Sequence, residues 1–366
     1  MSISISKFAG LKTLSLTFLL SLNCAVAADD ECQASGGYNF VCGLQNAEDL
    51  VLVAGTKWII SSSMAPDAAI FLIDSQNKSW SELYPADAPR AQQNMKTYGA
   101  CPGSPDPNNF ITHGLNLRPG ENGHSKLYVV NHGGREAIEV FDLNASGAIP
   151  ELTWTGCVML PEGMAANSVA SFSDGSLLVT VPLYPGKTIG DAFAGESTGA
   201  VYEWSSGDSG FELVQGTDLP YANGIEVSAD DREFYVVSSV LYTVIAYSHS
   251  NPARQLRTSR PMAFIPDNLH MGSDGKLITA GMVIDHPECG SIGYPNEFDL
   301  EEFATCPRPF IVKAIDSQTM AGEDLSRGPA NEHFSNATMG LQVGNEIWVG
   351  TFSGDRIGYR SLKQHD

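Results

Sequence analysis

The chain has 366 residues, of which 17% are charged and 9% aromatic, and it contains 36 glycines. This composition is typical of a folded, turn-rich, all-β protein and excludes a disordered chain. The formal net charge of −21 argues against nucleic acid and anionic membranes as partners, and it is compatible with binding of a cation.

The N-terminus has the pattern of a secretory signal peptide. Lys7 and Lys12 form a basic start before the apolar run Leu14–Leu22, which is followed by a small-residue cleavage site, Ala-Val-Ala. The run is too short to span a bilayer. We therefore expect residues 1–27 to be removed and residues 28–366 to form a single mature domain that is secreted or periplasmic.

Six cysteines follow the signal segment. Disulfides are expected in an exported chain of this kind. Spacing alone leaves other pairings open, and none of the cysteines has zinc-ligand spacing with a histidine. Pairing near neighbours first predicts the bridges Cys32–Cys42, Cys289–Cys306 and Cys101–Cys157.

Six segments share one pattern, in which a polar head precedes an apolar strand, a turn and a second apolar strand. In one copy, Asn167 leads into residues 169–172, the turn Asp174-Gly175 and then residues 177–179. Each interval between copies leaves room for two more strands. The six heads are Glu48, His113, Asn167, Asn223, Asp267 and Thr338.

Four-stranded units of about 40–50 residues are typical of a β-propeller, so the repeat predicts an all-β fold with six blades. The innermost strands of a propeller line its central channel, so we expect the six heads to meet at one mouth. A β-sandwich is the alternative architecture. It would not explain why one class of polar residue recurs at the same phase of each unit.

Four of the heads and the residue after one of them carry a carboxylate or an amide and so offer oxygen ligands only. Calcium takes six to eight oxygens and prefers carboxylates and amides, whereas zinc and copper prefer imidazole or thiolate. Taken alone, Asn-Gly is a common turn dipeptide and Asp-Asn could form an Asx turn, so the calcium hypothesis depends on the shared phase. The predicted ligands are Glu48, Asn167, Asn223, Asp267 and Asn268.

Several separated motifs stand in order from residue 48 to about residue 360: Glu48-Asp49, His113-Gly114-Leu115, Val129–His132, Asn167, Ala222–Ile225, Asp267-Asn268 and residues 345–359. In this order they resemble the serum paraoxonase/arylesterase family. The related gluconolactonase and senescence-marker-protein propellers share the metal ligands less completely and lack the histidine pair.

The resemblance implies that the five predicted ligands hold a catalytic calcium. It also implies a second, structural calcium at Asp49, the Leu115 carbonyl and the position of Ser168. Serine stands here where the family has an acid, so this second site is expected to bind calcium more weakly. The family closes its ring with a disulfide, but residues 357–359 contain no cysteine, so closure by strand pairing is expected.

The same resemblance assigns catalysis to His113 and His132. His113 would act as the base on a water molecule, and His132 would orient His113 or shuttle the proton. Three loops are expected to control access to the cavity: Met64–Ala68, Tyr184–Glu196 and Met282–Pro295. Five other histidines are interpreted as loop or core residues: His124, His249, His270, His286 and His333.

Together these features predict a secreted, calcium-dependent hydrolase of small-molecule lactones or aryl esters. A sugar lactonase of the gluconolactonase kind is the enzymatic alternative. The alternative from another class is a non-catalytic propeller, in which calcium braces the channel and the upper face binds a partner. The oligomeric state is left open.

Overall fold

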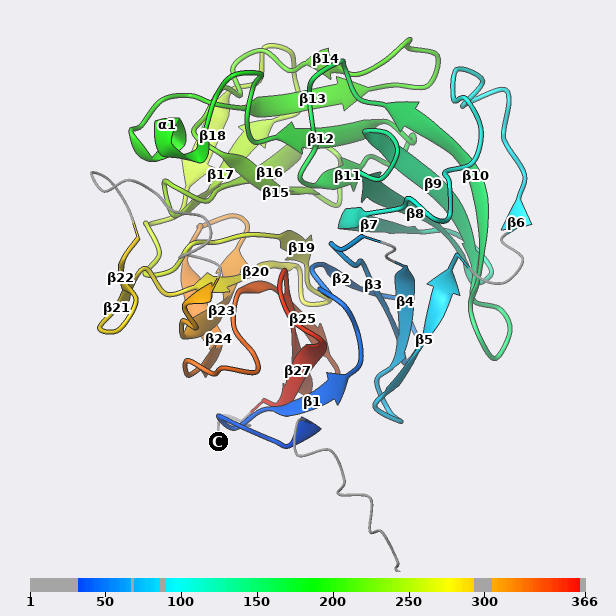
Figure 1. The fold of residues 1–366 in the computed structure, drawn as a ribbon. Coiled ribbons are helices and arrows are strands. Elements are labelled where there is room, and N and C mark those ends of the chain that lie inside the picture. Colours follow the sequence, from blue (N-terminus) through cyan, green and yellow to red (C-terminus); the bar gives the residue numbers. More distant parts are fainter. Residues whose placement is uncertain (1–31, 67–68, 86–89, 293–304, 363–366) are drawn as a thin grey trace, which may run out of the picture. The chain divides into compact units, whose positions relative to one another are not determined.

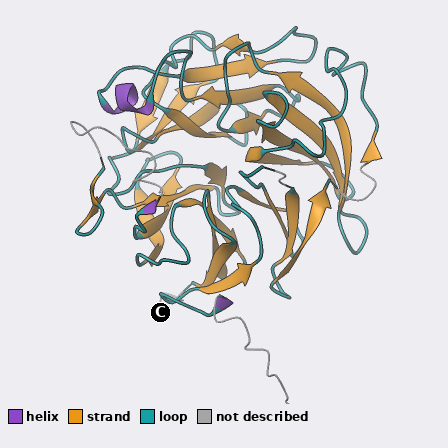
Figure 2. Ribbon diagram, viewed as in Figure 1, coloured by secondary structure: helices purple, strands orange, loops and turns teal. Residues whose placement is uncertain are grey.

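The computed structural model describes residues 32–66, 69–85, 90–292 and 305–362. The predicted signal peptide lies outside these residues. The described part is nearly all β and contains six sheets of four or five strands, which surround a common centre (Figures 1 and 2). The six-bladed β-propeller predicted from the repeat is confirmed.

Each of the first three sheets begins at the centre with the strand that follows or contains a polar head. The first contains β2 (Leu50–Leu52), β3 (Trp58–Ser61), β4 (Ile70–Asp74) and β5 (Ser79–Tyr84). The second contains β7 (Thr112–Pro119), β8 (His124–Asn131), β9 (Ala137–Asn144), β10 (Glu151–Met159) and the short parallel strand β6 (Arg90–Ala91). The third contains β11 (Val169–Ser171), β12 (Leu177–Val181), β13 (Ala200–Trp204) and β14 (Glu212–Leu213).

The other three sheets follow the same plan. The fourth contains β15 (Ala222–Val227), β16 (Glu233–Ser238), β17 (Thr243–Ser248) and β18 (Gln255–Thr258). The fifth contains β19 (Leu269–Met271), β20 (Lys276–Met282), β23 (Phe310–Asp316) and β24 (Gly322–Gly328). The sixth contains β25 (Ala337–Val343), β26 (Glu346–Thr351), β27 (Arg356–Ser361) and β1 (Asn39–Cys42).

Two small elements lie in the connections. The helix α1 (Ile189–Phe193) begins at Thr188, whose side chain and that of Asp191 form a capping box. A short hairpin pairs β21 (Asp285–His286) with β22 (Gly290–Ser291). Among the described helices, none has the length and hydropathy needed to cross a bilayer.

Most blade strands are buried on both faces because each sheet packs between two neighbours. All five residues of β4 and all five of β12 are buried. This explains why these strands read as continuous apolar runs instead of alternating ones. One core cluster joins Ile60, Val129 and Val179 from the first three blades, so the apolar contacts run from blade to blade around the ring.

The ring closes by strand pairing, as predicted. β1 comes from the N-terminal side of the chain and pairs antiparallel with β27, with Phe40 opposite Gly358 and Val41 opposite Ile357. The last blade therefore takes its outermost strand from the start of the domain. All three predicted disulfides are present: Cys32–Cys42, Cys101–Cys157 and Cys289–Cys306.

Candidate metal and catalytic site

A cavity of about 370 Å³ lies where the heads of the inner strands meet. Four of the five predicted calcium ligands line it together with His113, and Asn268 is fully buried behind them. Met64 and Ile189 lie in two of the segments expected over the cavity, and Met282, the first residue of the third, ends strand β20; all three line the cavity. The polar lining is Glu48, His113, Asn167, Asn223, Asp267, Ser239 and Tyr221.

Hydrogen bonds between neighbouring blades hold the heads in place on one side of the ring. Gly114 N donates to Asn167 O at 3.2 Å, and Gly224 N donates to Asp267 O at 3.1 Å. A Cβ at Gly224 would stand 2.5 Å from that same oxygen, and one at Gly114 would stand 2.6 Å from Asn167 O. Both glycines are thus required by the close approach of adjacent strands, and Asn223-Gly224 lies within β15.

The remaining blades are joined at the heads in the same way. Thr180 Oγ1 donates to Asn223 O at 2.5 Å. Asn268 N donates to Thr338 O at 3.1 Å, and Thr338 Oγ1 donates to Glu48 O at 2.6 Å. The backbone positions of the predicted ligands are therefore fixed by the ring itself and not by flexible loops.

Four buried oxygens of the predicted ligands have no hydrogen-bond partner within the described residues. Burial of a polar atom without a partner costs free energy, so such atoms are uncommon in folded proteins. The nitrogens of two of these side chains do have partners: Asn268 Nδ2 donates to Glu48 Oε1 at 2.5 Å, and Asn223 Nδ2 donates to Ser239 Oγ at 2.9 Å. The four oxygens are Glu48 Oε2, Asn167 Oδ1, Asn223 Oδ1 and Asn268 Oδ1.

The two carboxylates of the cavity lie in an unfavourable environment for negative charge. Burial and the nearby Asp49 and Asp267 raise the pKa of Glu48 well above its usual range. Asp267 keeps part of its surface open to the cavity, yet enclosure by protein raises its pKa to about 7. A cation among these groups would offset the cost of keeping both side chains ionised.

The donor set fits a hard cation such as calcium. It consists of two carboxylates and three amides, whose unpartnered oxygens are buried around one cavity. No group of three or more His, Cys, Asp or Glu side chains with a metal-binding arrangement occurs in the described part of the chain. A site built from these heads must therefore depend on the asparagine oxygens.

The residues assigned to a second calcium fit a cation less well. Asp49 Oδ1 accepts from Leu50 N at 2.8 Å and lies 2.8 Å from His270 Nε2, and Asp49 Oδ2 accepts from Leu115 N at 2.7 Å. Both oxygens are therefore already engaged by donors of the protein. The hydroxyl of Ser168 is buried without a partner among the described residues, but it adds no charge.

The structure brings the two predicted catalytic histidines together. His113 Nδ1 lies 3.0 Å from His132 Nε2, and His132 Nδ1 lies 2.7 Å from Glu136 Oε2. Burial, together with the neighbouring His132, lowers the pKa of His113 to about 3, so this ring is neutral at pH 7. His113 Nε2 is 3.8 Å from Glu48 Oε1, which places the ring beside the predicted metal ligands.

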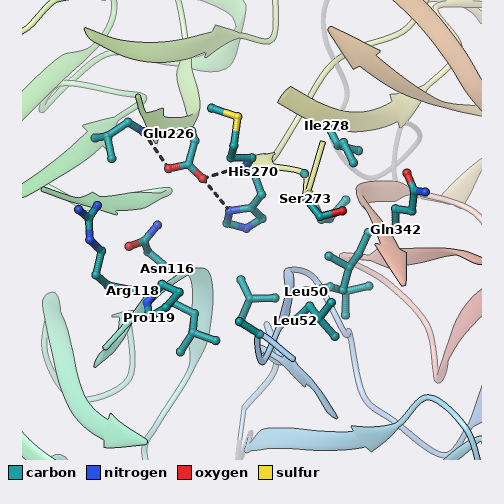
Figure 3. A pocket seen from close by; sticks show the side chains of 18 of the residues that line it. Leu50, Leu52, Asn116, Arg118, Pro119, Glu226, His270, Ser273, Ile278 and Gln342 are labelled. Atoms are coloured by element: carbon teal, nitrogen blue, oxygen red, sulfur yellow. Dashed lines mark hydrogen bonds and ion pairs between the residues drawn. The ribbon is translucent and has the colours of Figure 1, made fainter. Parts of the chain in front are cut away.

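A second cavity, of about 620 Å³, opens at the other ends of the same inner strands (Figure 3). His270 projects into it from β19 and faces Glu226, whose Oε2 lies 3.7 Å from His270 Nδ1. Burial alone would lower the pKa of His270, but the Asp49 and Glu226 carboxylates raise it to about 10. His270 is thus a buried, positively charged side chain between two carboxylates. The sequence predicted only that it would be a loop or core residue.

Two contributors to the site were not expected from the sequence. Glu136 is hydrogen-bonded to His132. In the sequence, this contact is indicated only by a carboxylate residue four positions after a histidine. Ile189 and Phe193 line the cavity from within the expected loop Tyr184–Glu196, but the helix α1 that carries them was not predicted, because five residues are too few for a helical period to be visible.

Comparison with solved structures supports the same architecture. The luciferin-regenerating enzyme matches with a TM-score of 0.51 and 12% identity over 89% of this chain and 94% of that one. A gluconolactonase from Xanthomonas campestris matches with a TM-score of 0.51 and 13% identity over 89% of both chains. At these identities the likeness shows the fold alone.

A third structure, described as the calcium-binding protein regucalcin from Agrobacterium tumefaciens, has a TM-score of 0.51 and 10% identity over 88% of this chain and 92% of that one. No curated protein matches the sequence. The model of one family, described as the SMP-30/gluconolactonase/LRE-like region, matches residues 62–288, which is more than half of the chain. The chain therefore belongs to the SMP-30/gluconolactonase/LRE-like family.

Proposed function

We propose that this protein is a calcium-dependent hydrolase of lactones and aryl esters. The observation that carries the proposal is a set of four buried oxygens without a partner among the described residues. Those of Glu48, Asn167 and Asn223 belong to residues that line the cavity with His113, and that of Asn268 lies behind them. Membership of the gluconolactonase-related family supports a lactonase-type propeller. The three disulfides support the view that the protein works after export from the cytoplasm.

The site offers the two components that hydrolysis of an ester bond requires. A calcium ion held by Glu48, Asp267 and the three asparagines would polarise the scissile carbonyl and stabilise negative charge on its oxygen. His113 is neutral and lines the same cavity, so its ring can accept a proton from an attacking water. His132 lies behind His113 and orients it through their 3.0 Å contact.

The remaining wall of the cavity favours apolar substrates. A sugar lactone would place its hydroxyl groups against apolar side chains that offer them no hydrogen bonds, which costs free energy. An acyl chain or an aryl ring would instead be stabilised by leaving water for this apolar wall. A sugar lactonase remains the second candidate because of the family match. The apolar lining is Met64, Ile189, Phe193, Val240, Ile265, Met282 and Phe352.

A substrate panel with and without a calcium chelator tests the proposal. We expect turnover of phenyl acetate and of acyl lactones that is lost on chelation and restored by calcium. His113→Ala should lower kcat by about 10²–10⁴-fold, the usual range for a lost general base. Preference for gluconolactone would favour the second candidate. If no ester or lactone is cut, the proposal fails and the non-catalytic binding propeller is favoured.

We also propose that the chain binds one calcium ion and not two, because the Asp49 carboxylate is engaged by His270 and two backbone N–H groups. Calorimetric titration of the chelator-treated protein should then give a stoichiometry of one per chain. Asn223→Ala should abolish that binding event. Two calcium ions per chain in the unaltered protein would show that Asp49 does bind metal.

A further inference from the structure

We propose that Glu136 is a positioning residue, which sets the protons of His132 and His113 so that His113 presents an unprotonated Nε2 to the cavity. The inference rests on the proposed function and adds a third member to its histidine pair. It concerns the arrangement of hydrogen bonds, because Glu136 itself does not line the cavity that the predicted ligands share.

The three side chains form a continuous chain of contacts from the surface to the cavity. Glu136 Oε2 lies 2.7 Å from His132 Nδ1, and His132 Nε2 lies 3.0 Å from His113 Nδ1. The exposed fraction of the side chain falls along this path, from 37% at Glu136 to 21% at His132 and 14% at His113. The carboxylate thus lies on the solvent side and the free edge of His113 lies inside.

The chemistry of the rings then assigns every proton. An ionised carboxylate can only accept, so His132 Nδ1 must carry the proton that is shared with Glu136. A neutral imidazole has one N–H, which leaves His132 Nε2 as an acceptor and makes His113 Nδ1 the donor. His113 Nε2 is therefore unprotonated, and its distance of 3.8 Å from Glu48 Oε1 leaves it free to accept a proton from water.

The segment that carries His132 and Glu136 is anchored by buried groups. Asn131 Oδ1 accepts from Gly133 N at 2.8 Å and from Ile111 N at 3.2 Å, which fixes the turn after β8. The backbone oxygen of Glu136 accepts from Leu160 N at 3.0 Å. The carboxylate is therefore presented to His132 from a fixed backbone, as a residue that orients another must be.

The proton balance of the step is simple. As the water oxygen forms its bond to the carbonyl carbon, one of its protons passes to His113 Nε2. His113 then carries a positive charge, which the Nδ1–H···His132···Glu136 chain stabilises. The same proton returns to the leaving oxygen when the ester bond breaks, so that His113 is restored.

The test uses Glu136→Ala and a matched control, Glu203→Ala. Glu203 Oε1 lies 3.0 Å from His249 Nε2, so the control removes an equivalent half-exposed histidine–carboxylate contact outside the site. We expect Glu136→Ala to lower kcat on phenyl acetate by about 10- to 100-fold with KM and calcium affinity unchanged, because only the orientation of the base is lost. Glu203→Ala should leave kcat unchanged.

A second readout does not depend on turnover. Long-range ¹H–¹⁵N spectra of the calcium-loaded protein should show His132 protonated at Nδ1, and in Glu136→Ala this proton should move to Nε2. Full kcat in Glu136→Ala, or an unchanged His132 tautomer, would overturn the inference while the proposed function stands. If the unaltered protein cleaves no ester or lactone, the proposed function fails and this inference falls with it.

Discussion

Asn268→Ala is expected to lower lactone and aryl-ester turnover by about 100-fold or more. The substitution removes one proposed oxygen ligand, and it also removes the amide that holds the Glu48 carboxylate in place. Asn268 Oδ1 is one of the unpartnered buried oxygens, and its Nδ2 donates to Glu48 Oε1 at 2.5 Å. The variant should therefore also bind calcium more weakly, which calorimetric titration measures beside the steady-state rates.

Asn116→Ala is the matched control for this change. Asn116 is also a buried asparagine on an inner strand, but it lines the cavity at the other end of the channel, where it accepts from Ser171 Oγ at 2.6 Å (Figure 3). Both variants lose a buried hydrogen bond, so they should lose similar stability. Equal losses of turnover in the two variants would mean that Asn268 acts only through the fold.

The second large effect is on stability. Glu139 is fully buried in β9, and its carboxylate accepts from Arg135 and from Trp154 Nε1 at 2.8 Å. Glu139→Ala should lower the free energy of unfolding by about 3 kcal/mol, because the mostly buried Arg135 would lose its counter-ion and Trp154 Nε1 its acceptor. Urea denaturation followed by tryptophan fluorescence would measure this loss.

Glu151→Ala serves as the comparison, because Glu151 pairs with Arg90 through two hydrogen bonds on the exposed edge of the same blade. Removing an exposed ion pair changes stability little. A similar shift of the denaturation midpoint in both variants would show that the Arg135–Glu139 pair contributes no more to stability than an exposed ion pair does. The Glu139 variant should also lose activity, since Arg135 belongs to the segment that carries His132 and Glu136.

Most of the architecture, and the meeting of polar heads at one cavity, could be predicted from the sequence because the propeller repeats. Each blade places its polar head at the same phase of an inner strand, so Asn167, Asn223 and Asp267 could be grouped without any distance information. The close approach of adjacent strands explains why glycine follows two of the heads, at Gly114 and Gly224. Closure of the ring by strand pairing was expected from the absence of a cysteine near residue 358, but which strands pair, β1 with β27, is seen only in the structure.

The features that the sequence did not reveal are those set by single contacts across the channel or within a loop. His270 stands only two residues after Asn268, yet the short strand β19 points it toward Asp49 and Glu226 of other blades. Glu136 lies in a turn without any periodic pattern, and its role depends on the direction of one side chain. No repeat carries this information, because neither contact recurs in the other blades that the structure describes.

The central claim is that the heads of the inner strands hold one calcium ion beside His113. A crystal structure of the protein grown with millimolar calcium, with anomalous differences measured at long wavelength, tests it most directly. We expect one peak within roughly 2.3–2.6 Å of oxygens from Glu48, Asn167, Asn223, Asp267 and Asn268, and none at Asp49. An intact propeller with no peak among these five residues, or with its only calcium at Asp49, would contradict the account.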